Sequence, residues 1–531
     1  MTQSKHVRII FYVCWTIALI LQATFTELLA DEAYYWKYSQ ALAWGYFDHP
    51  PVIALLIKAG YFLFANELGV RSLFILCNVL TIWIWEVLIK PKQLKLFYLM
   101  VLSVGILHFV GFIATTDAPF LLFSSCFILL YKHFLEQPNW KLSLLLAITV
   151  SAMLLTKYHG LVVIGLVVLS NHNLLKSRYF WLTTTLASVF MIPHIMWQVE
   201  AGFPSFKYHL FERSHLPYQF TNTLEYIATQ PFVFGPVIGF LFFIAFIKFK
   251  PNNLFDKAMV YLFWGGYTFF FIMSFKGRIE AYWTLFALIP SLYIGYYQIN
   301  ASEKLTKVLS KQFPYVIVLI VLARIYLMFG FLPNTKVTEG LSSKFHHKKS
   351  TMKAIHKIAN NTPVVFMNSY QKASLYEFYT GVASFSLNNV MGRKNQYTIW
   401  KSEEKYRGEE VMIIPNFDTP SFDTIPNISK TTYYTFIKNF QSYSQVGIQP
   451  MTTLSKLPKS DTISVDLSIV KNNELEVDFT ANKEYPSFVY AQFFNGNRLI
   501  KQDRLFLLKN SQIGTTVSTQ IVMPQAIGRC E

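Results

Sequence analysis

The chain has 531 residues, of which 53% are hydrophobic and 15% are charged, and its formal net charge is +17. Soluble globular domains are about one quarter charged, so this composition excludes an ordinary soluble protein. The excess of Lys and Arg indicates membrane topology, because no segment interleaves basic and aromatic residues in the manner of a nucleic-acid groove.

Long apolar segments follow one another between residues 8 and 333, and residues 334–531 contain none. A helix needs about 20 residues to cross the hydrocarbon core of a bilayer. The first part is therefore predicted to be a mainly α-helical polytopic membrane domain with about eleven transmembrane helices. The predicted spans are residues 8–30, 69–89, 96–114, 118–134, 141–156, 159–171, 179–198, 231–249, 258–275, 281–299 and 313–333. Residues 51–65 are expected to form a re-entrant or interfacial helix.

The charges of the loops orient these spans. When the loops are assigned alternately to two sides, one side holds most of the Lys and Arg residues, and the other holds about as many acids as bases. The positive-inside rule places the first side, with the N-terminus, in the cytoplasm. An odd number of spans then places residues 334–531 on the outer side, and one missed span would reverse only this tail. The acids near span ends lie in the outer loops, where we expect the chemistry.

The first outer loop carries two acidic clusters. Asp31 and Glu32 follow the first span directly, and the sequence Asp48-His49-Pro50-Pro51 forms a rigid turn among aromatic residues. The acidic pair also fits a solvated cap at the start of the next helix, so a structural and a functional interpretation are both open here.

The next two outer turns each contain one candidate residue, an acid in the first and a base in the second. Asp117, in the sequence TTDAP, is typical of a helix N-cap, and that position is compatible with a functional role. Lys157 lies between two apolar stretches, where it either extends its ammonium group to the interface or serves a functional site.

Further basic residues follow. The loop at 200–230, with Lys207, His209 and Arg213, has the length of a lid or binding loop. The turn from Lys276 to Glu280 is either an interfacial anchor or an anion site, and phosphate is the natural anion for adjacent Lys and Arg side chains. Arg324 lies inside the last span, where both snorkelling and function are open. His194, at a span end, is expected to be structural.

The outer C-terminal part is predicted to have two regions. Residues 336–440 are expected to be α/β, with strands at 364–367, 383–387 and 411–414 and helices at 345–361 and 370–380. Residues 441–531 alternate apolar and polar residues at 463–467, 475–479, 488–490 and 505–507, which is typical of a small β-sandwich. The segment 416–430 has the composition of a linker. No catalytic group of residues is evident in either region.

Acids and bases that converge at one membrane face suggest group transfer from a lipid phosphate. A carboxylate can deprotonate an acceptor hydroxyl, and cations can stabilise a phosphate leaving group. The sequence contains no HExxH, Walker A or GxSxG motif.

The strings that carry these residues resemble a known superfamily. DEAYYWKYSQALAWGYFDHPP, TTDAPF, TKYHG, FPSFKYHLFER and FKGRIEAYW occur in this order. They are similar to the GT-C superfamily of integral-membrane glycosyltransferases, in the branch of the protein O-mannosyltransferases and the lipid A aminoarabinose transferases. The resemblance covers residues 1–335, which would form the GT-C catalytic domain. Tyr34 stands where the aminoarabinose transferases have Arg, so their acceptor is not carried over.

The resemblance implies roles for the residues above. The donor would be a sugar on a polyprenyl phosphate, and transfer to a hydroxyl of a lipid, glycan or protein acceptor would invert the anomeric carbon on the outer face of a bacterial inner membrane. Asp31 would be the base, Glu32 its support or an acceptor ligand, and Asp117 a second acid. The donor phosphate would be held by Lys157, Lys276, Arg278 and Arg213. Substrate contacts are expected from Tyr35, Asp48, His49, Tyr158, His209 and Glu280. A divalent metal near Asp31, His49 and Asp117 is open, since no ligand spacing is diagnostic.

Two other functions compete with this interpretation. A polytopic transporter or lipid flippase would place charges at the bilayer midplane and break its spans there, whereas the charges here gather at one interface. A non-catalytic envelope assembly protein would leave the clustered acids and bases unexplained.

Overall fold

The computed structural model describes residues 2–210, 218–332, 335, 338–388, 393–416, 419–425, 431–444, 446–451, 462–471, 477–482, 485–495 and 498–523. The chain divides into two compact units, Met1–Met352 and Lys353–Glu531. A mainly helical first part followed by a sheet-containing region is the architecture expected from the sequence, and it is confirmed.

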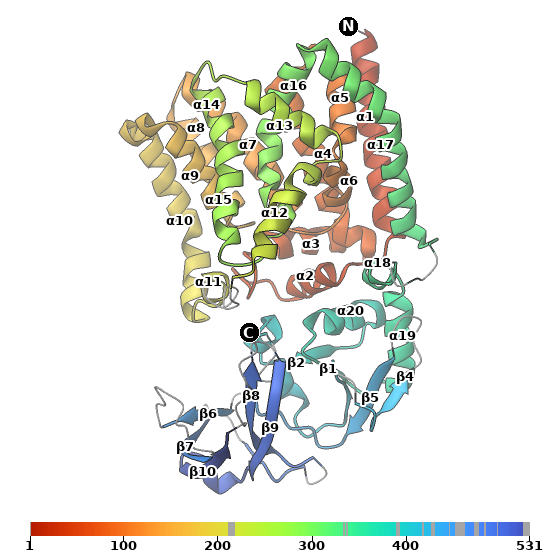
Figure 1. The fold of residues 1–531 in the computed structure, drawn as a ribbon, viewed down its shortest axis with the longest axis vertical. Coiled ribbons are helices and arrows are strands. Elements are labelled where there is room, and N and C mark those ends of the chain that lie inside the picture. The colour runs from red at the N-terminus through yellow and green to blue at the C-terminus, as the bar shows by residue number, and fades with distance from the viewer. Residues whose placement is uncertain are drawn as a thin grey trace. The chain divides into compact units, whose positions relative to one another are not determined.

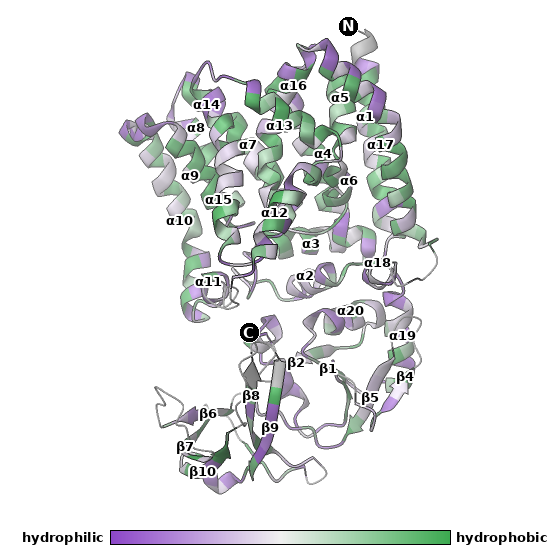
Figure 2. Ribbon diagram, in the orientation of Figure 1, coloured by the Kyte–Doolittle hydropathy of each residue, from purple (hydrophilic) through white to green (hydrophobic). Residues whose placement is uncertain are grey.

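The first unit is a bundle of helices (Figure 1). Figure 2 shows hydrophobic residues along most of the length of these helices and hydrophilic residues at their ends. The helices are α1 (Thr2–Phe25), α2 (Ala30–Gln40), α3 (Val52–Leu63), α4 (Glu67–Ile89), α5 (Leu94–Ser103), α6 (Gly105–Val110), α7 (Asp117–Glu136), α8 (Trp140–Leu154), α9 (Gly160–Ser170), α10 (Arg178–Glu200), α11 (Pro204–Leu210), α12 (Phe220–Val233), α13 (Ile238–Lys248), α14 (Leu254–Val260), α15 (Gly266–Ser274), α16 (Leu288–Asn300), α17 (Glu303–Phe329) and α18 (Glu339–Phe345).

Five of the described helices are long and apolar enough to cross a membrane, namely α1, α4, α7, α10 and α17. The bent pair of α12 and α13, whose axes differ by 95°, adds a sixth if it counts as one span. Helices occupy all eleven positions at which spans were predicted. Several of them are shorter than a full span, so the number of crossings stays a prediction.

Four predicted spans are interrupted, one of them (231–249) at the bend between α12 and α13, and the break in 96–114 has a long-range contact beside it. The segment 96–114 divides into α5 and α6 where the amide of Gly105 donates to the carbonyl of Phe234 at 2.9 Å. Gly235 has a φ of +141°, and a Cβ there would lie 2.6 Å from the carbonyl oxygen of Ser103. The other two breaks are a π-helical turn at Tyr261–Gly265 and a 3₁₀ turn at Ala281–Ala287.

Unit 2 begins within α19 (Lys348–Ala359) and continues into a mixed five-stranded sheet of order β2-β1-β3-β5-β4. Its strands are β1 (Val364–Met367), β2 (Ser384–Leu387), β3 (Val411–Ile414), β4 (Asp423–Ile425) and β5 (Thr432–Ile437), and α20 (Tyr370–Thr380) connects β1 to its parallel neighbour β2. The short helix α21 (Gln396–Ile399) precedes β3, which is also parallel to β1, and β5 is antiparallel to β3. The segment 416–430 was expected to be a linker, but it contains β4, which pairs with β5 and so belongs to the sheet.

The last region contains two antiparallel sheets. One has the order β10-β7-β6 and the other is the hairpin of β8 and β9. The strands are β6 (Val446–Pro450), β7 (Thr462–Lys471), β8 (Phe488–Asn495), β9 (Arg498–Leu507) and β10 (Thr516–Val522). Alternate residues of β7, from Ile463 to Ile469, share one apolar core with Val489 and Leu508. Residues 475 and 476 of the strand expected at 475–479 lie outside the described residues, and 477–479 are not in a strand.

Candidate functional site

The first turn of α2 presents two neighbouring carboxylates in opposite environments. Asp31 is exposed, whereas Glu32 is completely buried. Oε1 of Glu32 accepts hydrogen bonds from Arg71 Nε and the amide of Ala114, both at 2.8 Å. Oε2 accepts from Arg71 Nη2 at 2.5 Å and from the amide of Leu29 at 2.8 Å. Four donors therefore occupy the acceptor sites of Glu32, which fixes the start of α2 and with it the position of Asp31.

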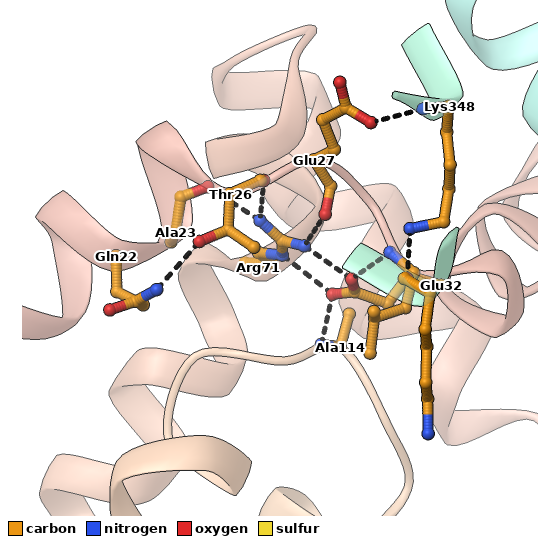
Figure 3. Close-up of polar contacts among 10 residues, drawn as sticks. Gln22, Ala23, Thr26, Glu27, Glu32, Arg71, Ala114 and Lys348 are labelled. Atoms are coloured by element: carbon orange, nitrogen blue, oxygen red, sulfur yellow. Dashed lines mark hydrogen bonds and ion pairs between the residues drawn. The ribbon is translucent and has the colours of Figure 1, made fainter. Parts of the chain in front are cut away.

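Arg71 completes this buried cluster (Figure 3). Its side chain has no exposed surface. Nη1 donates to the carbonyls of Ala23 at 2.8 Å and Thr26 at 2.6 Å, and Nη2 donates to the carbonyl of Glu27 at 3.0 Å. Together with the two bonds to Glu32, all five N–H groups of the guanidinium have partners. Arg71 thus ties the end of α1 and the start of α2 to α4.

Arg71 was not among the residues predicted to belong to the site, yet it is the central cation of this cluster. The available signal was its position just inside an apolar span, where an ionisable residue is seldom unpaired. Its partner was not readable from the sequence, because Glu32 lies 39 positions away.

Glu27 makes a further contact at this end of the unit. Its Oε2 accepts from the backbone amides of Lys348 at 2.7 Å and Lys349 at 3.3 Å, at the start of α19. A carboxylate at a helix N-terminus satisfies free amides and complements the helix dipole. Burial lowers the pKa of the Lys348 side chain to about 8, although the charge of Glu27 acts in the opposite direction.

This pKa predicts a pH-dependent stability. Below about pH 8 the Lys348 ammonium is charged in both states, and its desolvation costs folding free energy. Between pH 8 and about 10.5 the unfolded chain binds more protons, so stability rises with pH. Lys348→Met should therefore raise the unfolding temperature at pH 7 and lose that advantage toward pH 10.5. Lys349→Met, at an exposed neighbour, is the control, and an equal gain at both pH values would contradict this account.

Asp117 and Lys157 form a second buried pair. Lys157 Nζ lies 2.6 Å from Asp117 Oδ1, and the two residues are 8% and 6% exposed. Asp117 is the first residue of α7, one position after the cap, and its Oδ2 accepts from Thr115 Oγ1 at 3.2 Å. The ring centroid of Tyr282 lies 5.4 Å from Lys157 Nζ. This contact links the pair to the turn that carries Lys276 and Arg278.

The residues of that turn are more open. Lys276 and Arg278 are exposed, and Glu280 is half-buried. Arg278 Nη2 lies 3.3 Å from Glu225 Oε1, and both side chains are more than half exposed. An exposed pair of this kind contributes at most about 1 kcal/mol, so Arg278 can exchange Glu225 for another anion at little cost. Arg213 lies outside the described residues.

The second part of the first outer loop is held by aromatic and histidine side chains. Tyr38 OH donates to Asp48 Oδ2 at 3.2 Å, and Tyr35 OH is 2.9 Å from His49 Nε2. His209 Nε2, on α11, is 3.0 Å from the carbonyl of Asp48. Asp48 is buried, whereas Tyr35, His49 and His209 are half-buried and line the same region.

Tyr158, next to Lys157, connects that loop to α10. Its OH lies 3.0 Å from Nε2 of His194, whose Nδ1 is 2.6 Å from the carbonyl of Trp44. Because a carbonyl only accepts, Nδ1 of His194 carries a proton, and the buried ring ties α10 to the first outer loop. The ring centroid of Tyr158 is 5.9 Å from that of His209. Burial raises the pKa of Tyr158 to about 12, so its phenol remains a neutral hydrogen-bonding group.

The structure thus gathers most of the predicted residues at the α2 end of unit 1. Among the described residues, no group of three His, Cys, Asp or Glu side chains is placed to hold a metal ion. Asp31, His49 and Asp117 therefore do not form such a group, and we derive no step through a metal.

Two sequence comparisons show what the chain is similar to. Residues 48–197 match the family model described as dolichyl-phosphate-mannose-protein mannosyltransferase. The chain is 26% identical over 249 residues to the lipid A galacturonosyltransferase RgtD of Rhizobium johnstonii, which covers 43% of this chain and 51% of RgtD. The chain thus spans about half the length of this curated relative.

A solved structure extends the similarity to the fold. The apo structure of ArnT from Cupriavidus metallidurans matches with a TM-score of 0.58 at 14% identity, over 81% of this chain and 98% of ArnT. The chain therefore has the fold of ArnT, which is the mainly helical membrane fold that the resemblance implied. The matched family segment contains Asp48, His49, Asp117, Lys157 and Tyr158.

Proposed function

We propose that the chain is a glycosyltransferase that moves a sugar from a polyprenyl-phosphate donor to a hydroxyl of a lipid, glycan or protein acceptor. The observation that carries this proposal is the exposed Asp31 on the first turn of α2, which the hydrogen bonds between Glu32 and Arg71 hold in place. Lys157, Lys276 and Arg278 lie at the same end of the bundle. The match to mannosyltransferases and the similarity to RgtD support it.

In the proposed reaction, Asp31 accepts the proton of the acceptor hydroxyl. The hydroxyl oxygen attacks the anomeric carbon from the side opposite the phosphate, the bond from that carbon to the phosphate oxygen breaks, and polyprenyl phosphate leaves. One displacement of this kind inverts the anomeric carbon. Glu32 acts as a positioning residue, because its lone pairs are already engaged by Arg71 and two backbone amides.

The cations would stabilise the phosphate as it leaves. Asp117 engages one N–H of the Lys157 ammonium, and the ammonium retains further donors for a phosphate oxygen. Lys276 and Arg278 are exposed on the adjacent turn and would supply a second cation and a planar fork. Arg213, in the sequence segment 200–230, is retained as a weaker candidate.

The remaining site residues would shape the sugar and acceptor pocket. Tyr35, His49 and His209 offer rings and hydrogen-bonding groups beside the backbone of Asp48, Tyr158 borders Lys157, and Glu280 belongs to the cationic turn. By the charge of the loops, this face would be the outer face, with the N-terminus in the cytoplasm. The resemblance implies that the membrane is a bacterial inner membrane.

The experiment that tests this function measures free polyprenyl phosphate released from a radiolabelled sugar-lipid pool by the purified full-length protein and cell-envelope extract. Release, with the label transferred to a new acceptor, is the expected result. Movement of intact labelled lipid across vesicles without release would instead establish the transporter or flippase. No release from any sugar-lipid pool would contradict the proposed function.

Lys157→Gln is expected to weaken donor use about tenfold to a hundredfold, since a hydrogen bond to a charged group contributes about 1.5–3 kcal/mol. The measurement is kcat/KM for the sugar-lipid donor. Lys176→Gln, at an exposed lysine after α9, is the matched control and should leave kcat/KM unchanged. Equal values for Lys157→Gln and the control would remove Lys157 from the phosphate site.

A further inference from the structure

A membrane-embedded groove lies along one side of the bundle, away from the residues discussed above. It is a cavity of about 610 Å³ between α1, α5 and α17. Its walls are mostly aliphatic and aromatic, for example Phe11, Leu99 and Ile317, and its lining includes two cationic residues, Lys95 and Arg324. This volume falls in the usual range of ligand pockets, about 300–1,000 Å³.

The groove has the length of one leaflet. On α1 its lining extends from Val7 to Ala18, and on α17 from Phe313 to Arg324, so the two helices run side by side in the same direction. The eleven residue-to-residue steps from Val7 to Ala18 correspond to about 16 Å of helix. One leaflet occupies about half of a hydrocarbon core of about 30 Å. A single acyl chain of a phospholipid matches this length, whereas a long polyprenyl chain would exceed it.

Arg324 supplies a charge without a counter-charge. Its Nε donates to Gln22 Oε1 at 3.2 Å, Nη1 lies 3.3 Å from His108 Nδ1, and Nη2 donates to the carbonyl of Ala18. Within the described part of the chain, none of these partners is a carboxylate. An unpaired cation in an apolar environment is costly, so an anion beside Arg324 would relieve that cost. The guanidinium also has five N–H groups, more than these contacts use.

The position of Arg324 suits a headgroup. It lies five residues before the end of α17, about 8 Å along the helix axis, and α17 ends at the same end of unit 1 as α1 (Figure 1). A lipid headgroup at that membrane surface can therefore reach the guanidinium while its chain follows the groove toward Val7.

We propose that the groove between α1, α5 and α17 holds an acyl chain of an anionic membrane phospholipid, whose headgroup phosphate binds Arg324. This site is separate from the proposed donor phosphate site and does not rest on the proposed function.

Hydrogen bonds also connect the groove to the cluster of Glu32 and Arg71 that holds the first turn of α2. Gln22 donates to Thr26 Oγ1 at 2.8 Å, and the carbonyl of Thr26 accepts from Arg71 at 2.6 Å. Gln22 and Thr26 are buried, so Arg324 and Arg71 are joined by one short series of contacts. A lipid that binds only the folded protein stabilises it by mass action, and here the stabilised region includes the first turn of α2.

Native mass spectrometry of the purified full-length protein in a neutral detergent tests the site. The probe is phosphatidylglycerol, compared with phosphatidylcholine of the same acyl chains. Wild type should retain phosphatidylglycerol at least tenfold more tightly than phosphatidylcholine and gain unfolding temperature from it. Arg324→Gln, which keeps a side-chain amide for Gln22, should lose about tenfold or more of this affinity. Arg324→Lys should restore part of it.

Two further variants separate binding from general damage. Cys14→Trp fills the groove and leaves Arg324 in place, so it should also lose phosphatidylglycerol. Arg178→Gln, at an exposed arginine that starts α10, should bind as wild type does. Retention by Arg324→Gln, or equal affinity for the two phospholipids, would overturn the proposal. Displacement of phosphatidylglycerol from Arg324 by equimolar polyprenyl phosphate would overturn it too, because the groove would then prefer a prenyl chain.

Discussion

Asp31→Asn is expected to reduce sugar transfer by about 10²–10⁴-fold, which is the usual contribution of a general base. Asn has nearly the shape of Asp and still forms hydrogen bonds, but it cannot accept the proton of the acceptor hydroxyl. Asp31 is exposed on the first turn of α2, so the substitution buries nothing and should leave folding and membrane insertion unchanged. Polyprenyl phosphate release by equal amounts of purified protein measures the effect.

The control for this prediction is a carboxylate with no place in the site. Glu136 is 63% exposed at the end of α7 opposite to Asp117, and Glu136→Gln should transfer sugar at the wild-type rate. Wild-type activity in Asp31→Asn would show that another group takes the proton.

Much of the fold was predictable because its cause is local. Long apolar runs specify helices wherever they occur, and period-two alternation placed β7 from Ile463 onward. The breaks have another origin. The division between α5 and α6 depends on the contact of Gly105 with Phe234, more than a hundred positions away in the sequence, and no local pattern contains that information.

The candidate site shows the same limit. Charge bias in the loops was sufficient to place Asp31, Asp117, Lys157 and the turn at Lys276 on one face. The sequence did not show that Asp31 and Glu32 have different environments, because nothing in the neighbouring residues says which of two adjacent carboxylates is buried. Burial separates them in the structure, where one carboxylate is exposed and the other has four donors. The importance of Arg71 was missed for the same reason, since it follows from tertiary packing.

The cluster of Glu32 and Arg71 leads to the second large effect. Arg71→Met should destabilise the protein by about 3–5 kcal/mol, the usual cost of removing one partner of a buried ion pair. Glu32, which has no exposed surface, would then lose two of its four donors, and three carbonyls near the end of α1 would lose theirs. The measurement is the unfolding temperature of purified protein in detergent, with membrane yield as a second readout.

The exposed pair of Arg278 and Glu225 gives a control of matched residue types. Arg278→Met should change stability by no more than about 1 kcal/mol, because that pair is solvated. The loss of stability in the double variant Glu32→Gln with Arg71→Met should be smaller than the sum of the losses in the two single variants, since the double variant has no buried carboxylate without its partner. Sugar transfer should still fall in the double variant, because the first turn of α2, which carries Asp31, is no longer held by Glu32 and Arg71. Additive effects, or Arg71→Met as stable as Arg278→Met, would mean that this cluster does not hold the start of α2.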